Sequence, residues 1–259
     1  APASPAAAAP KGDMTWGLKP FEKQQTLRLA FFTGSPLSYP YLFADKLGVF
    51  NALNIKIEYI HFTGGPAMME ANSAWDMGSL GLGGISLGLA KYDNLTLIDV
   101  NDYEENMAIF ARPGSKIAKD PANPANWKGV KCVYPTGTTG QTVLAQYLKS
   151  MGLGLADVVS VNMDNANGLT AFNGGTGDVL VCWNAIALAA DDYGFYRVTD
   201  SGKLKLPFPC ATFVQKKYLA NNKQLVTTAV AVFHKAIEWV YASPANLKQS
   251  AKWYFNHCE

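Results

Sequence analysis

Hydrophobic residues along this chain form short runs that alternate with stretches of helical spacing. Unbroken or alternating apolar runs are typical of strands, which predicts strands over 27–32, 55–60, 77–82, 95–100, 107–112, 130–134, 158–161, 178–182, 195–198 and 211–214. Apolar residues three and four apart predict helices over 39–47, 66–73, 85–91, from 138 or 139 onward, over 225–241 and from near Pro244. Strands and helices that alternate at this spacing predict βαβ units and mostly parallel sheets.

Two breaks divide this alternation into two α/β series. The first is Arg112-Pro113-Gly114-Ser115, and the second covers residues 200–208. After the second break the chain returns to one strand and to helices, and 225–241 carries an apolar face that must pack on another element. The simplest arrangement is two lobes joined by two crossings, with a ligand in the cleft between them.

The segment 130–147 combines a short strand, a glycine-containing turn and a helix. The turn is Thr136-Gly137-Thr138-Thr139-Gly140, and Thr138 or Thr139 is a suitable N-cap. Unpaired backbone N–H groups and the positive end of the helix dipole would face outward there. Such a junction can hold a small anion or another ligand rich in hydrogen-bond acceptors.

The same kind of junction occurs twice more. Residues 33–35 (Thr-Gly-Ser) and 63–65 (Thr-Gly-Gly) each follow a predicted strand and precede a predicted helix. Ligands of open α/β sheets bind beyond the carboxyl ends of the strands. We therefore expect these turns to gather around one site.

Composition excludes several classes of function. The chain is 49% hydrophobic and 16% charged with a formal charge of +2, which suits a globular protein without a nucleic-acid surface. The four cysteines and three histidines show no metal-binding spacing, so no metal and no cofactor is expected. A Cys182–Cys210 disulfide stays open, since spacing cannot decide it. Gly81-Leu82-Gly83-Gly84 lacks the third glycine of a dinucleotide fingerprint, and 137–142 lacks the lysine of a P-loop.

The first ten residues form an alanine- and proline-rich segment that cannot pack a core. Such a segment is found between a membrane anchor and an exported domain, and equally as an ordinary disordered terminus. No apolar run approaches the roughly 18–20 residues that span a bilayer.

Several short segments follow one another in a fixed order between residues 27 and 245. They are Gly34-Ser35, 44–50 (ADKLGVF), 62–67 (FTGGPA), 75–81 (WDMGSLG), 127–131 (WKGVK), 136–139 (TGTT) and 177–184 (GDVLVCWN). Together they resemble the motifs of ABC-importer solute-binding proteins, in the NMT1-like branch for sulfonates, nitrate, taurine and thiamine precursors. No single segment is specific on its own.

The resemblance implies an α/β fold of the type II periplasmic-binding-protein class, in which each lobe is a mostly parallel sheet flanked by helices. The implied lobes are residues 27–108 plus 210–259 and residues 109–209, with hinges near 107–112 and 207–212, after a flexible tail of residues 1–26. The implied function is to close on a small polar or anionic solute, sulfonate-like or heteroaromatic, and to deliver it to a membrane permease. We expect a monomer outside the cytoplasm, periplasmic or lipid-anchored on the outer face of the membrane.

The resemblance also implies a ligand shell at the strand ends, with no catalytic residue. Carried over by position, this shell is Gly34, Ser35, Gly64, Gly65, Leu82, Gly83, Thr138, Thr139, Asn165, Trp183 and Asn184. Asn165 has the alternative role of capping the helix that follows it. Among the aromatic residues near strand ends, Tyr39 and Trp183 are expected to contact the ligand and the others to pack in the core.

Two departures from the family pattern bear on the ligand. Asn184 stands where aminosulfonate-binding members carry an acidic residue, which argues against a taurine-like zwitterion. The chain has only three arginines, so an anion would depend on backbone N–H groups and hydroxyls. The acidic residues Asp102, Glu104 and Glu105 have two interpretations, selection of a cationic ligand or an exposed acidic loop.

An enzyme of the same fold, acting on a pyrimidine or vitamin precursor, is the alternative. The chain carries no G-x-S-x-G turn and lacks the cysteine cluster of the pyrimidine-forming branch. A binding protein returns its ligand chemically unchanged, which distinguishes the two.

Overall fold

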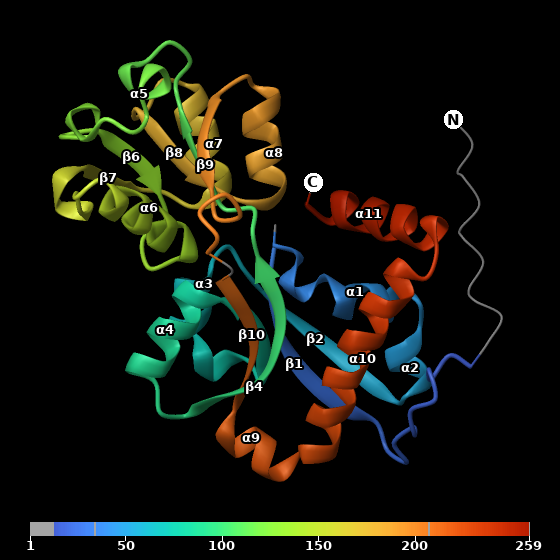
Figure 1. Cartoon of the computed structure of the whole chain (residues 1–259). Coiled ribbons are helices and arrows are strands. Elements are labelled where there is room, and N and C mark those ends of the chain that lie inside the picture. The colour runs from blue at the N-terminus through green and yellow to red at the C-terminus, as the bar shows by residue number, and fades with distance from the viewer. Residues whose placement is uncertain (1–12, 34, 207, 259) are drawn as a thin grey trace.

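The computed structural model describes residues 13–33, 35–206 and 208–258 and shows two lobes, each built on one five-stranded sheet (Figure 1). The predicted ligand residue Gly34 and the first twelve residues of the predicted tail lie outside the described residues. The predicted α/β two-lobe fold class is confirmed.

The sheet of the first lobe has the strand order β2-β1-β3-β10-β4. Its strands are β1 (Gln25–Phe32), β2 (Ile55–Phe62), β3 (Met77–Gly81), β4 (Leu95–Glu104) and β10 (Phe208–Gln215). The helices of this lobe are η1 (Pro36–Ser38), α1 (Tyr39–Lys46), α2 (Val49–Ala52), α3 (Gly65–Glu70), η2 (Asn72–Ala74), α4 (Leu82–Lys91), α9 (Lys216–Asn221), α10 (Lys223–Tyr241) and α11 (Pro244–Cys258).

The sheet of the second lobe repeats this plan with the order β7-β6-β8-β5-β9. Its strands are β5 (Ala108–Ala111), β6 (Lys131–Tyr134), β7 (Val159–Asn162), β8 (Val179–Cys182) and β9 (Tyr196–Asp200). Its helices are α5 (Lys116–Lys119), η3 (Pro124–Asn126), α6 (Thr139–Ser150), η4 (Leu155–Asp157), α7 (Asn165–Asn173) and α8 (Asn184–Asp192).

One strand in each sheet runs against the others, and it is the strand that enters from the opposite lobe. The chain leaves the first lobe after β4 and enters the second as β5, which pairs antiparallel with β8 and β9. It returns after β9 as β10, which pairs antiparallel with β3 and β4. The other strands of each sheet share one direction, so the mostly parallel character is as predicted.

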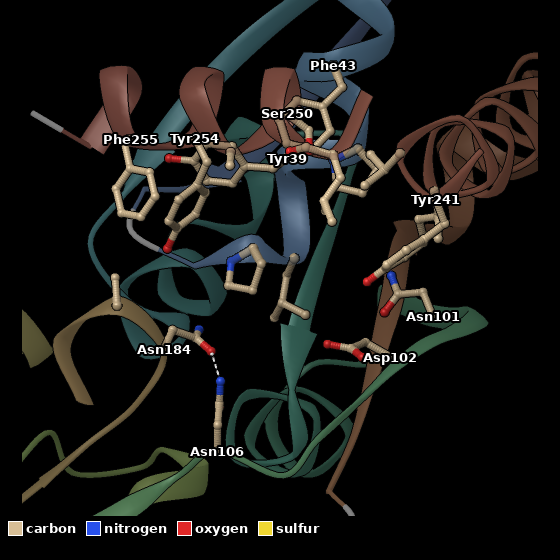
Figure 2. Close-up of a pocket in the computed structure, with 18 of the residues that line it drawn as sticks. Tyr39, Phe43, Asn101, Asp102, Asn106, Asn184, Tyr241, Ser250, Tyr254 and Phe255 are labelled. Atoms are coloured by element: carbon tan, nitrogen blue, oxygen red, sulfur yellow. Dashed lines mark hydrogen bonds between the residues drawn. The ribbon is translucent and has the colours of Figure 1, made fainter. Parts of the chain in front are cut away.

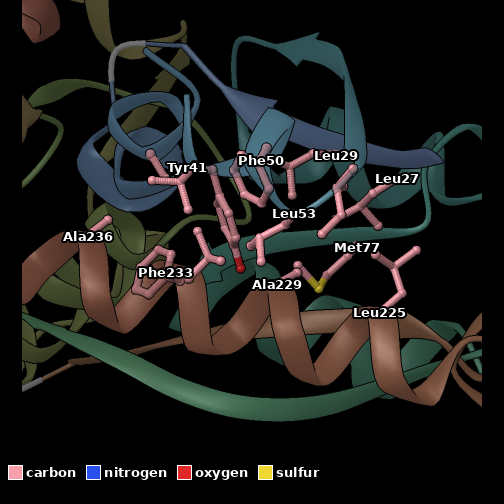
Figure 3. Packing of buried hydrophobic residues seen from close by; sticks show 14 of the residues in the cluster. Leu27, Leu29, Tyr41, Phe50, Leu53, Met77, Leu225, Ala229, Phe233 and Ala236 are labelled. Carbon is pink, nitrogen blue, oxygen red and sulfur yellow. The ribbon is translucent and has the colours of Figure 1, made fainter. Parts of the chain in front are cut away.

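The predicted amphipathic helix 225–241 is α10, and its apolar face packs on the first sheet (Figure 3). Leu225, Ala229 and Phe233 from this face meet Leu27 and Leu29 of β1 in one buried cluster. Because apolar residues recur at helical spacing on only one side of α10, this packing is the arrangement that removes them from water.

The start of α4 and the end of β4 differ from the sequence prediction, and both lie beside the cleft. Helix α4 begins at Leu82, three residues before the predicted start, so the glycine run is its first turn. Strand β4 continues to Glu104 instead of ending at residue 100, because β10 pairs along its whole length. Its pairing with β10 shifts register at Asn101, which lies in a β-bulge between the pairs Val100–Ala211 and Asp102–Cys210.

The Cys182–Cys210 disulfide left open by the sequence is not formed. Cys182 is a free thiol buried in β8 of the second lobe, whereas Cys210 belongs to β10 of the first. Cys132 is also a buried free thiol, and burial raises its pKa to about 12, so it stays protonated near neutral pH.

A buried carboxylate joins β1 to the start of β3. Asp76 accepts hydrogen bonds from the backbone N–H of Arg28 at 2.9 Å and from Arg28 Nη2 at 2.6 Å. The Asp76 side chain is only 6% exposed, so it depends on these donors to replace water.

We expect Asp76→Ala to lower the free energy of unfolding by about 2 kcal/mol, because it leaves both Arg28 donors without their charged partner. Urea denaturation would measure the change. Glu58→Ala is the matched control, since both side chains of the Lys56–Glu58 ion pair are exposed. It should lower the free energy of unfolding by less than about 1 kcal/mol. Equal losses in the two variants would contradict this interpretation of Asp76.

Candidate ligand-binding cleft

The cleft between the lobes is surrounded by helix starts. Between them lies a cavity of about 30 Å³, which we call the inner cavity. Its walls come from the starts of η1, α3 and α4 in the first lobe and of α6 and α8 in the second; they are Phe32, Leu37, Gly65, Pro66, Leu80, Gly81, Gly84, Met107, Thr138, Thr139 and Trp183. A space of this size holds water-sized molecules, so a larger solute requires the lobes to separate.

The lobes touch where α4 meets α6. The backbone N–H of Gly83 donates to Thr139 Oγ1 at 3.2 Å. A Cβ atom on Gly83 would lie 2.3 Å from the carbonyl carbon of Thr138, which no packing arrangement tolerates. Glycine at this position therefore lets two backbones approach across the cleft.

Trp183 forms part of the inner cavity wall and is also a core residue. Its side chain is 4% exposed and belongs to the main apolar cluster of the second lobe. The side-chain amide of Asn165 forms two hydrogen bonds with the backbone of Trp183. Nδ2 donates to Trp183 O at 3.2 Å, and Oδ1 accepts from Trp183 N at 3.4 Å. Asn165 thus positions Trp183, and Asp164 is the residue that caps α7.

A second and much larger hollow of about 610 Å³ lies on the other side of Leu37, and we call it the outer pocket (Figure 2). Leu37 lines both spaces. Aromatic and aliphatic side chains from α1, α10 and α11 form one wall, and the start of α8 forms the facing wall. The labelled aromatic residues of the first wall are Tyr39, Phe43, Tyr241, Tyr254 and Phe255.

The opposite side of the outer pocket is polar. Asn106 Nδ2 donates to Asn184 Oδ1 at 2.8 Å, which joins the crossing after β4 to the start of α8. Asn184 has a left-handed backbone with φ 54°, and its Nδ2 is buried without a hydrogen-bond partner among the described residues. Ser35 Oγ, directly before η1, is likewise buried and unpaired within the described part of the chain. Buried polar atoms in this condition are suited to bind ligand groups.

Asn101 shows how the bulge in β4 shapes this polar side. Its Nδ2 donates to Ser79 Oγ at 3.0 Å and to Thr212 Oγ1 at 2.9 Å, so the side chain is held on the sheet. Its Oδ1 is buried and has no partner among the residues that the structure describes. The neighbouring Asp102 is exposed and lines the same pocket.

All three arginines of the chain are engaged away from the inner cavity. Arg28 pairs with Asp76, and Arg112 donates to the backbone carbonyls of Phe172 and Gly177. Arg197 reaches the rim of the outer pocket, where Asp191 binds it through two hydrogen bonds and raises the pKa of its guanidinium. None of the described residues that line the inner cavity is charged.

The predicted ligand shell is distributed over several parts of the cleft. Gly65, Thr138, Thr139 and Trp183 line the inner cavity, and Tyr39 and Asn184 line the outer pocket. Leu82 and Gly83 form the first turn of α4 at the contact with α6. Ser35, Gly64 and Asn165 line neither space.

The sequence did not reveal the wall made by α10 and α11. The run Trp253-Tyr254-Phe255 near the end of the chain is a signal of an apolar surface, but its place opposite α8 depends on the tertiary fold. Tyr39 of α1, 1% exposed, packs against Tyr254 of α11 with ring centroids 4.5 Å apart, so these two helices of the wall support each other.

Among the described residues, no group of three or more histidine, cysteine, aspartate or glutamate side chains is placed to hold a metal ion. His61, the only histidine considered for the cleft, lies with Nδ1 3.1 Å from Thr33 Oγ1 and lines neither space.

We expect Gly83→Ala to hold the lobes further apart. The helix itself accepts alanine, which is favoured over glycine by about 1 kcal/mol in a helix, whereas the α4–α6 contact has no room for a Cβ atom. Small-angle scattering should therefore show a larger radius of gyration with an unchanged circular dichroism spectrum. Gly154→Ala, where no atom lies within 4 Å of the added Cβ, is the matched control. A variant as compact as the native protein would contradict the assignment of this contact.

Comparisons with known proteins agree with this architecture. Residues 35–247 match the sequence profile of the family described as NMT1/THI5 like. Proteins of Brucella abortus and Brucella suis, provisionally named as binding proteins, are 25% identical over 215 residues; the match covers 78% of this chain and 62% of theirs.

Solved structures share the fold at low identity. The alkanesulfonate-binding protein SsuA of Xanthomonas axonopodis, bound to MOPS, has a TM-score of 0.73 at 19% identity, covering 90% of this chain and 80% of that one. The aliphatic sulphonate-binding protein SsuA of Escherichia coli has a TM-score of 0.72 at 21% identity, and the match covers 90% of this chain and 83% of that one. The nitrate-binding protein NrtA of Synechocystis has a TM-score of 0.70 at 13% identity, with 88% of this chain and 65% of that one covered. The chain therefore belongs to the NMT1/THI5-like family and has the two-lobe fold of periplasmic solute-binding proteins.

Proposed function

We propose that this protein is an extracytoplasmic solute-binding protein of an ABC importer, which closes its two lobes on a small polar or anionic solute. One observation supports this most directly. Helix starts from both lobes face each other across the inner cavity, and the buried atoms Ser35 Oγ and Asn184 Nδ2 close by lack partners among the described residues. A bound solute would satisfy those atoms and connect the lobes at once.

Closure would occur about the two crossings. The connection between β4 and β5 covers residues 105–107, and the connection between β9 and β10 covers 201–207. Each leads directly into the strand next to the central one of the receiving sheet, so small backbone rotations there would move one lobe as a rigid body. We propose lobes close to the expected residues 27–108 plus 210–259 and 109–209, with β5 from Ala108 in the second lobe and β10 from Phe208 in the first.

The partner in this proposal is the membrane permease of the importer, which would recognise the closed form. Periplasmic neighbours of the same fold support a place outside the cytoplasm, and we propose a monomer that is periplasmic or lipid-anchored. In the described part of the chain, no helix is both long and apolar enough to span a bilayer. The match covers 62% of the length of the curated relatives, so the activity of the whole protein is part of this proposal.

Two classes of solute fit the helix starts. A sulfonate-like anion would be held by backbone N–H groups of α6 and α8 and by the hydroxyl of Thr139, because the Thr138 hydroxyl donates to Pro135 O and every arginine is engaged elsewhere. A heteroaromatic solute would stack near Trp183 and pair with amide groups. An aminosulfonate is disfavoured, since Asn184 cannot neutralise its ammonium group. The binding-protein neighbours support a non-enzymatic role over the enzyme alternative.

A thermal-shift screen against sulfonates, oxyanions, pyrimidines and amino acids tests the proposal. A solute present at about 100 times its dissociation constant stabilises the folded protein by roughly 2.7 kcal/mol. We expect the matching class to raise Tm by roughly 5–10 °C. Mass spectrometry should recover that solute unchanged, whereas a chemically altered solute would favour the enzyme alternative.

Thr138→Asp tests the position of the solute. Aspartate is a good N-cap, so the free energy of unfolding should change by no more than about 1 kcal/mol. A carboxylate at this wall should weaken binding of a sulfonate at least tenfold by calorimetry, because it repels the anion where the helix start attracts it. Thr176→Asp, on an exposed loop of the second lobe, should leave affinity unchanged. Retained affinity in Thr138→Asp would place the solute elsewhere.

A further inference from the structure

We infer that the outer pocket takes an organic cation, an aromatic or alkyl ammonium whose apolar body lies on the rings of α10 and α11 and whose positive nitrogen faces Asp102. The inference rests on the proposed function in one respect, since it needs the lobes to close on a bound solute; its site is the outer pocket, on the other side of Leu37 from the inner cavity. It differs from the proposed solute in the sign of the charge.

The first argument is the size and lining of the outer pocket. Its volume of about 610 Å³ lies within the range of ligand sites for drug-sized molecules, whereas the inner cavity of about 30 Å³ does not. Exposed apolar residues on both lobes border it, with Tyr241 and Phe255 on one side and Leu188 of α8 on the other. A solute with an apolar body would remove these side chains from water as the lobes close on it.

The second argument is the concentration of aromatic rings on one wall. Tyr39 contacts Tyr254 with centroids 4.5 Å apart and Phe43 at 6.1 Å, and Tyr254 contacts Phe255 at 5.6 Å. Figure 2 shows these rings on the side of the pocket opposite Asn106 and Asp102. Such rings cover the apolar body of a ligand, and a charged group at the other end of that ligand then reaches the polar side of the pocket.

The third argument is the charge of the pocket. Among the residues that the structure describes, Asp102 and Arg197 are the only charged ones that line it. Arg197 is neutralised by Asp191 and lies 3.7 Å from Asp200 through Nη1, while no ion pair among the described residues involves Asp102. The net charge facing the pocket is therefore negative, which favours a cation and opposes an anion.

The fourth argument is the hydrogen-bonding capacity beside Asp102. Asn101 Oδ1 is buried and unpaired among the described residues, and Asn101 and Asp102, which follow each other in β4, both line the pocket. Two acceptor groups at one end of the pocket complement a ligand with N–H donors, as an ammonium group has. The bulge at Asn101 is what brings consecutive residues of β4 to this edge.

Three probes with one apolar body and different charges test the inference: phenethylammonium, phenethyl alcohol and phenethylsulfonate. We expect calorimetry to show the ammonium binding about tenfold more tightly than the sulfonate, with the alcohol between them. Asp102→Asn should weaken ammonium binding about fivefold and leave the alcohol unchanged. Asp93→Asn, at an exposed aspartate in the turn after α4, is the matched control.

A second pair of variants tests the place of binding independently of charge. Ala251→Trp puts an indole into the outer pocket from the exposed side of α11 and should abolish binding of the ammonium. Ala245→Trp is the control, because Ala245 is exposed on the same helix and does not line the pocket. Thermal unfolding of both variants should match the native protein.

The outcomes separate the two proposals. Sulfonate binding equal to or tighter than ammonium binding, or ammonium binding that survives Ala251→Trp, overturns the inference while leaving the solute-binding function standing. Failure of every probe, together with no stabilisation by any class in the thermal-shift screen, overturns both. Ammonium binding that is weakened by Asp102→Asn and lost in Ala251→Trp supports the assignment of the outer pocket.

Discussion

The exchange of one strand between the lobes is the constraint on which the rest of this structure depends. β5 enters the second sheet from the first lobe, and β10 enters the first sheet from the second lobe, each beside its central strands. Because both inserted strands are antiparallel to their neighbours, the crossings emerge at the same edge where the parallel strands end. The carboxyl ends of both sheets, and the helix starts that follow them, therefore face one cleft.

Within that cleft, two kinds of surface lie on either side of Leu37. Neutral helix starts with hydroxyl groups surround the inner cavity, and the backbones of α4 and α6 meet there because Gly83 has no side chain. Aromatic rings and a carboxylate surround the outer pocket. Lobe closure couples the two, since each contains residues from both lobes.

Much of this arrangement is predictable from the sequence because it follows from local patterns. The strands, α10 and the turn at 136–140 are marked by apolar spacing and by glycine and threonine at the strand ends. Tertiary contacts decide the remainder. The β4 bulge at Asn101 depends on pairing with β10, more than a hundred residues later, and Asn165 pairs with the backbone of Trp183 instead of lining a cavity. The wall of α10 and α11 requires knowing where the last helices pack.

The central claim is that the two lobes close on a solute held between them, and pulsed electron-paramagnetic-resonance distances test it most directly. Spin labels at Lys91→Cys in α4 and Lys149→Cys in α6 report the separation of the lobes from exposed positions. The account predicts a shorter and narrower distance distribution once the solute identified by thermal shift is added. A distribution that stays the same while calorimetry shows saturation would contradict it, because the solute would then bind to one lobe alone.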